Sequence, residues 1–108
     1  MSRDRRIAPR FPVILVAEIA ALPLGPSRSG RTSDISRTGC YMDSLKPFAS
    51  GTRVRIKLTR ANETFETLAT VVYANSGLGM GIHFDDNIEP GQLDVLNRWL
   101  EAFEHQAH

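Results

Sequence analysis

The sequence contains few of the residues from which disulfide-bonded and zinc-binding proteins are built. Its 108 residues include one cysteine, Cys40, so an internal disulfide and a cysteine-based zinc site are both excluded. We interpret Cys40 as a small core residue rather than a nucleophile. A single cysteine is typical of a reducing compartment, and we expect a cytoplasmic protein.

Long hydrophobic runs are also missing. The longest candidate covers residues 13–22 and is interrupted by Glu18, whereas a membrane helix needs about 20 consecutive apolar residues. Residues 1–10 are polar and rich in arginine, without the apolar stretch of a secretory signal. We therefore expect no membrane segment.

Catalytic motifs are equally scarce. The sequence has no Gly-x-Ser-x-Gly elbow, no His-Glu-x-x-His pair and no phosphate loop ending in Gly-Lys-Thr. His83 lies between apolar neighbours in a strand pattern, on the outward side, and we interpret it as structural or solvated. Asp85 and Asp86 follow that strand and are typical of a turn. We expect neither an enzyme nor a metal site.

Lysine is rare, and the charges are unevenly distributed along the chain. Eleven of the thirteen basic residues are arginine, whose planar guanidinium suits phosphate groups and guanine edges. Residues 1–40 contain seven arginines and three acids, a net charge of +4. Residues 85–108 contain six acids and one arginine, a net charge of −5. This pattern favours an anionic partner at the N-terminal side.

Short segments of alternating polarity are abundant and are typical of β-strands. In residues 53–60 the apolar Val54, Ile56 and Leu58 alternate with polar residues, which predicts a strand with one exposed face. Residues 64–74 are rich in strand formers, and we expect a bulge there. Residues 22–30 contain two prolines, two glycines and two serines and are interpreted as a loop. The expected strands cover residues 13–20, 31–36, 40–44, 53–60, 64–74 and 79–84.

The hydrophobic period changes near the C-terminus. Leu93, Leu96, Leu100 and Phe103 recur every three or four residues, which predicts a helix over about residues 90–105 that covers an end or seam of the sheet. Short connections between the strands imply antiparallel pairing in a closed or nearly closed barrel. The predicted fold class is all-β with one helix: a six-stranded antiparallel β-barrel followed by a C-terminal α-helix.

Residues 1–12 are interpreted as a flexible, arginine-rich arm, and residues 13–108 as a single domain. The arm contains Arg6 and Arg10, four positions apart, with Arg5 beside them. A turn at the intervening proline would bring both guanidinium groups onto one ligand. Composition alone gives about one such Arg-x-x-x-Arg pair by chance, so the spacing by itself has little weight.

A second polar segment combines Asp34, Ser36 and Gly39. In an extended chain Asp34 and Ser36 point the same way, so we expect a carboxylate and a hydroxyl to face outward while Ile35 anchors the core. Asp34 suits the N1–H and amine of a guanine base, Ser36 suits a phosphate or base atom, and Gly39 allows a ligand or backbone to approach closely. By composition, an Asp-x-Ser-x-x-Gly match is expected only about 0.03 times.

Arg6-x-x-x-Arg10 and Asp34-x-Ser36-x-x-Gly39 together resemble the signature of PilZ domains, bacterial receptors for cyclic di-guanylate (cyclic di-GMP). The resemblance covers nearly the whole chain, including the opening segment and the late strand Gly79-Met80-Gly81-Ile82-His83-Phe84. It implies a six-stranded barrel of the PilZ-like, split-barrel type with a C-terminal helix, in agreement with the strand count.

The resemblance also implies a ligand, cyclic di-GMP, and a division of roles. The arm would clamp the phosphates and guanine edges, and the barrel rim would form the fixed half of the site. The residues concerned are Arg5, Arg6 and Arg10 in the arm and Asp34, Ser36 and Gly39 on the rim. Binding would change the conformation of the arm and signal to a downstream protein partner. One ligand molecule or an intercalated pair would both fit this scheme.

Two other functions fit the same fold. One is a ligand-independent PilZ-type adaptor that acts by protein–protein contacts. Family members that have lost nucleotide binding generally lack the motif arginines, however, and these are present here. The other is a small barrel that binds single-stranded nucleic acid by stacking bases on exposed aromatic side chains. The chain has five Phe, two Tyr and one Trp, and most fall on predicted core faces, so we expect no DNA partner.

Overall fold

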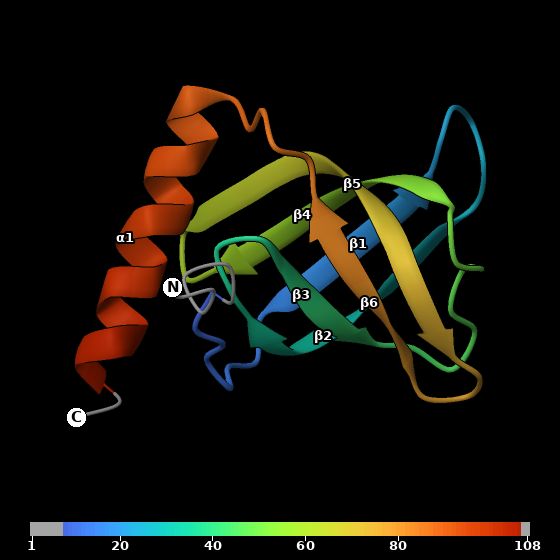
Figure 1. Cartoon of the computed structure of the whole chain (residues 1–108), viewed down its shortest axis with the longest axis horizontal. Helices are drawn as coiled ribbons and strands as arrows, with labels where there is room; N and C mark the ends of the chain where they lie inside the picture. Colours follow the sequence, from blue (N-terminus) through green and yellow to red (C-terminus); the bar gives the residue numbers. More distant parts are fainter. Residues whose placement is uncertain (1–7, 107–108) are drawn as a thin grey trace, which may run out of the picture.

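The computed structural model describes residues 8–106, which form a β-barrel with a helix at one end (Figure 1). The elements are β1 (Val16–Ala21), β2 (Ser27–Ile35), β3 (Gly39–Asp43), β4 (Arg53–Arg60), β5 (Glu63–Asn75), β6 (Gly79–Phe84) and α1 (Pro90–Gln106). The strands close in the order β1-β2-β3-β6-β5-β4, and all neighbours are antiparallel. The predicted six-stranded antiparallel barrel with one C-terminal helix is confirmed.

The hairpin formed by β1 and β2 differs in extent from the prediction. Residues 27–30, which were interpreted as part of a loop, form the first half of β2 and pair with β1. The first strand begins at Val16 rather than at residue 13. Hydrogen bonds to β1 hold this Ser- and Gly-rich segment in the sheet, and local composition contains no information about that tertiary partner.

The inside of the barrel is filled by apolar side chains from all six strands. On β4 the predicted alternation is confirmed, because Val54, Ile56 and Leu58 are fully buried and the basic residues between them are exposed. Cys40 is buried among these side chains, as predicted for a small core residue. The outer face of the strands carries mainly polar side chains, with Val16, Val72 and Tyr73 as exposed apolar exceptions.

Helix α1 packs its apolar face against one end of the barrel (Figure 1). Trp99 and Phe103 are buried there, and the Trp99 indole N–H donates a hydrogen bond to Glu63 Oε1 at 2.9 Å. The carboxylate of Glu89 caps the helix by accepting a hydrogen bond from the backbone N–H of Gln92. No helix of the described chain has the length and hydrophobicity needed to cross a membrane.

Residues 8–15 run along β2 before β1 begins. Phe11 and Ile35 exchange two backbone hydrogen bonds, of 2.9 and 3.0 Å. The buried Thr32 hydroxyl of β2 donates to the carbonyl of Val13 at 2.8 Å. These bonds fix the register of the N-terminal segment against the strand that carries the second polar motif.

Candidate functional site

Asp34 faces outward because β2 contains a bulge next to it. The pairing of β2 with β3 shifts register between Thr32 and Asp34, which leaves Ser33 as the extra residue. Thr32 is therefore directed into the core, whereas the Asp34 side chain is 31% exposed. β-Bulges commonly re-aim a side chain in this way near functional sites. The expected outward orientation of Asp34 is confirmed.

Arg10 contacts this carboxylate from the N-terminal segment. The pairing of Phe11 with Ile35 brings Arg10 alongside the end of β2, and Arg10 Nη2 donates to Asp34 Oδ1 at 2.6 Å. The Arg10 side chain is 48% exposed, so this is a surface ion pair, worth at most about 1 kcal/mol. The fold thus joins two residues of the two polar motifs, 24 positions apart in the chain.

Ser36 does not face outward, and that part of the prediction is wrong. The residue is fully buried in the turn between β2 and β3. Its hydroxyl accepts a hydrogen bond from the backbone N–H of Thr38 at 3.2 Å and donates to the carbonyl of Gly39 at 3.3 Å. The hydroxyl therefore satisfies the backbone of a tight turn, a use of serine that competes with strand alternation.

Gly39 begins β3, where the backbones of two strands come very close. It pairs with His83 of β6, and a Cβ atom at Gly39 would overlap the carbonyl oxygen of Ile82. The sequence predicted close approach of a ligand or of backbone at this position. In the structure the close neighbour is the backbone of β6, so only glycine fits.

A shallow pocket of about 110 Å³ lies on the outer face of β3, β5 and β6, with Arg10 at its edge. Tyr73 contributes an aromatic wall and is 48% exposed. Its ring lies directly over Gly81, where a Cβ would collide with it. The pocket is lined by Arg10, Thr38, Gly39, Cys40, Val72, Tyr73, Gly81, Ile82 and His83.

Sequence reasoning missed Tyr73 and His83 as pocket residues. Regular alternation from the buried Val71 would direct Tyr73 inward, but a bulge between Val71 and Tyr73 turns it outward. A bulge was expected in this strand, and the structure shows that Tyr73 is the side chain it redirects. His83 is exposed on the outer side of β6, as predicted. The sequence feature that could have indicated this contact is Gly81, because a glycine within a strand often marks close approach of another group, here the Tyr73 ring.

The remaining predicted site residues, Arg5 and Arg6, lie outside the described residues. Cys40 lines the pocket but supplies no reactive group. Burial raises the pKa of its thiol to about 12 and keeps the thiol protonated. Between residues 8 and 106, no three His, Cys, Asp or Glu side chains come together as metal ligands would. The described part of the site therefore consists of a guanidinium, a carboxylate, an aromatic ring and a glycine-bordered backbone surface.

A six-stranded antiparallel barrel with a C-terminal helix, and with an arginine–carboxylate pair beside its β2–β3 turn, resembles a small barrel of PilZ type. The sequence matches the PilZ domain family over residues 4–102, and the chain belongs to this family. PilZ domains are non-catalytic receptors for cyclic di-GMP. No curated protein matches the sequence at a significant level.

Solved PilZ structures share the fold. The PilZ domain of CeSA from a cellulose-synthesizing bacterium has a TM-score of 0.70 and 24% identity, covering 91% of this chain and 100% of that one. The Escherichia coli YcgR PilZ domain with cyclic di-GMP has a TM-score of 0.73 and 18% identity, covering 95% and 94%. The Bacillus subtilis inhibitor of motility MotI/DgrA has a TM-score of 0.74 and 19% identity, covering 96% of this chain and 53% of that chain.

Proposed function

We propose that this protein is a receptor for cyclic di-GMP, which it binds on the barrel face shared by Arg10 and Asp34. The observation that carries the proposal is the 2.6 Å contact that joins Asp34 to Arg10, a lining residue of the outer pocket, in a member of a family of cyclic di-GMP receptors. An arginine fork binds a phosphate or the O6/N7 edge of guanine. A carboxylate accepts hydrogen bonds from the N1–H and amine of the same base.

The two groups neutralise each other when no ligand is present. Cyclic di-GMP provides a new hydrogen-bonding partner for each side chain. Its phosphates and guanine acceptors suit Arg10, and its guanine donors suit Asp34. The exchange leaves neither charge unpaired, so the ion pair holds the site ready at little cost in affinity. Tyr73 supplies a flat surface against which a purine can stack.

Ser36 and Gly39 act through the shape of the rim. Ser36 holds the turn in place with its hydroxyl, and Gly39 lets β3 lie close to β6, so the backbone around the pocket is fixed before ligand arrives. Arg5 and Arg6 precede this site in the chain and would add two further guanidinium groups to the ligand. Ordering of the arm around the nucleotide changes the surface offered to a downstream protein partner in the cytoplasm.

Isothermal titration calorimetry with cyclic di-GMP tests the proposal. We expect saturable binding, with the affinity lowered about 10- to 150-fold in Arg10→Ala or Asp34→Ala, since a charge-assisted hydrogen bond is worth about 1.5–3 kcal/mol. Arg55→Ala is the matched control, because Arg55 is exposed on β4 away from the pocket. The absence of saturable binding, or equal affinities in all variants, would refute the proposal. The same titration gives the number of ligands per chain.

Competition separates this function from the two alternatives. All of the Phe, Tyr and Trp side chains lie between residues 8 and 106; that of Tyr73 is exposed, and the others are buried or half-buried. A single stacking surface is poorly suited to a strand of nucleic acid, which uses several. A single-stranded oligonucleotide should therefore fail to displace cyclic di-GMP. An adaptor without a ligand would show no titration signal at all.

A further inference from the structure

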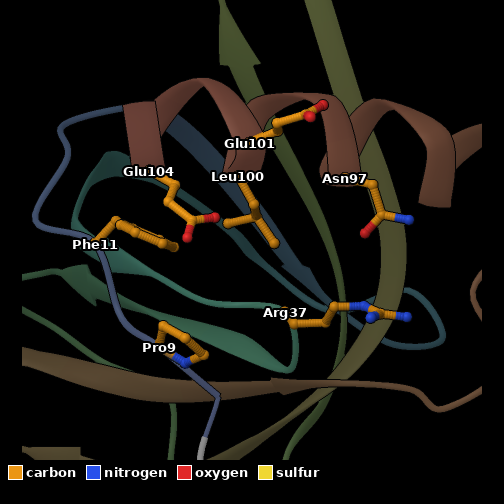
Figure 2. A pocket seen from close by; sticks show the side chains of 7 residues that line it. All are labelled: Pro9, Phe11, Arg37, Asn97, Leu100, Glu101 and Glu104. Atoms are coloured by element: carbon orange, nitrogen blue, oxygen red, sulfur yellow. The ribbon is translucent and has the colours of Figure 1, made fainter. Parts of the chain in front are cut away.

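A second concave surface lies between α1 and the N-terminal segment (Figure 2). It is a groove of about 240 Å³, separate from the pocket that contains Arg10. One wall comes from the N-terminal segment and the β2–β3 turn, and the other comes from α1. The lining residues are Pro9, Phe11 and Arg37 on the first wall and Asn97, Leu100, Glu101 and Glu104 on the second.

The groove and the Arg10 pocket lie on opposite sides of the same two backbone segments. Pro9 and Phe11 line the groove, whereas Arg10 between them lines the pocket. Arg37 likewise lines the groove, and Thr38 after it lines the pocket. For residues 9–11 this follows from the alternation of side chains along extended chain. Residues 9–11 therefore lie between the two surfaces.

The groove combines an apolar floor with a charged rim, which carries the carboxylates of Glu101 and Glu104 on α1 and the guanidinium of Arg37 on the opposite wall. Phe11 and Leu100 form the floor, and the Phe11 ring is backed by Phe103 at a centroid distance of 6.4 Å. Glu101 and Glu104 are exposed, and neither forms an ion pair with another described residue. In Figure 2 the Glu104 carboxylate is directed into the groove, near Phe11 and Leu100. A suitable occupant carries a cation on an apolar stem, and arginine has both.

Such an occupant lies directly upstream in the chain. Residues 1–7 contain Arg3, Arg5 and Arg6 against a single acid, Asp4. An extended chain spans at most about 3.5 Å per residue, so Arg6 and Arg5 are within about 10 and 14 Å of the groove-lining Pro9. The connection keeps these cations at high effective concentration beside the two glutamates.

We propose that in the nucleotide-free protein residues 1–7 dock in this groove, with their arginines against Glu101 and Glu104. The inference rests on the proposed function, since the same Arg5 and Arg6 are expected to contact cyclic di-GMP. The groove and the nucleotide then compete for these two side chains. Ligand binding withdraws them and leaves the acidic face of α1 open to a protein partner.

A paramagnetic label tests the docking without any nucleotide. The label is attached to Ser2→Cys, and the native Cys40 does not interfere because it is buried. At low salt we expect broadening of the amide resonances of Glu101 and Glu104, and its loss in the Glu101→Gln/Glu104→Gln double variant. Asp94→Asn is the control, because it removes an acid of α1 that does not line the groove. No broadening in the parent protein, or equal broadening in every variant, would overturn the proposal.

Calorimetry with cyclic di-GMP then tests the competition. Removing the competing site should tighten nucleotide binding about two- to tenfold in the Glu101→Gln/Glu104→Gln variant, the range expected for one or two exposed ion pairs. Asp94→Asn changes the net charge by one and should leave the affinity nearly unchanged. Equal affinities in the double variant and the parent would refute the competition. If no variant binds nucleotide, the proposed function fails, and the label experiment alone decides whether the docking is correct.

Discussion

Gly39 offers the sharpest test of how the Asp-x-Ser-x-x-Gly segment depends on the barrel. A Cβ atom introduced by Gly39→Ala would overlap the carbonyl oxygen of Ile82 and lie 3.1 Å from its carbonyl carbon and 3.2 Å from His83 Cα. All three atoms belong to the backbone of β6, so no change of rotamer relieves the overlap. The strands β3 and β6 must separate, and the turn hydrogen bond from Ser36 N–H to the Gly39 carbonyl, now 2.8 Å, is strained with them.

The expected penalty follows from this geometry. Overpacking of a well-ordered interior costs about 1–3 kcal/mol, and a purely backbone clash belongs at the upper end. A loss of about 3 kcal/mol is a large part of the roughly 5–15 kcal/mol that holds a domain folded. Since about 1 kcal/mol shifts the midpoint of a domain of this size by about 4–8 °C, we expect Tm to fall by roughly 10–25 °C.

Urea unfolding followed by the fluorescence of the buried Trp99 measures this penalty. Gly91→Ala is the matched control, because a Cβ there meets first the flexible Glu89 carboxylate, at 3.1 Å, and Gly91 lies in the first turn of α1. Alanine favours a helix by up to about 1 kcal/mol over glycine, which offsets a small shift of the capping Glu89 carboxylate, so this variant should stay within about 1 kcal/mol of the parent. A Gly39→Ala protein with the parent's midpoint would refute the reasoning.

Two further predictions concern titratable groups. The thiol of Cys40, whose pKa burial raises to about 12, should stay unreactive toward a thiol reagent at mildly alkaline pH in the folded protein and react at once in denaturing urea; rapid reaction in the folded state would contradict its burial. The hydrogen bond from Arg53 holds the pKa of Asp85 below its usual range, so this carboxylate stabilises the fold above the unfolded pKa and loses that contribution as the pH falls below about 4. In Asp85→Asn the urea midpoint should therefore fall less steeply as the pH is lowered below about 4. An unchanged slope would contradict the stabilising role of the Asp85 carboxylate.

Periodicity predicted most of the fold because the core imposes it. The alternation on β4 and the three- and four-residue spacing on α1 are direct consequences of burying one face of each element. The start of β2 was missed because periodicity is absent there. Residues 27–30 have the composition of a loop and form a strand only through pairing with β1. Local chemistry could not reveal a partner that the chain meets through a tertiary contact.

The site was less accessible to sequence reasoning than the fold. The outward position of Asp34 was expected from simple alternation, but in the structure it depends on the bulge at Ser33. The same alternation predicted that Ser36 faces outward. In the structure Ser36 is buried, because its hydroxyl forms hydrogen bonds with the backbone of the turn. Contact between Arg10 and Asp34 needs the pairing of Phe11 with Ile35, which no local pattern encodes.

The extra residue in β2 gives the Asp34-containing segment a length requirement as well as a composition. Deleting Ser33 would restore regular alternation and turn the carboxylate of Asp34 toward the barrel interior, or reverse every position upstream of it, including the buried Thr32. A chain could thus keep every letter of both motifs and lose the arginine–carboxylate contact through a single missing residue. The number of residues between the start of β2 and the turn therefore matters to the arginine–carboxylate contact as well as the motif letters.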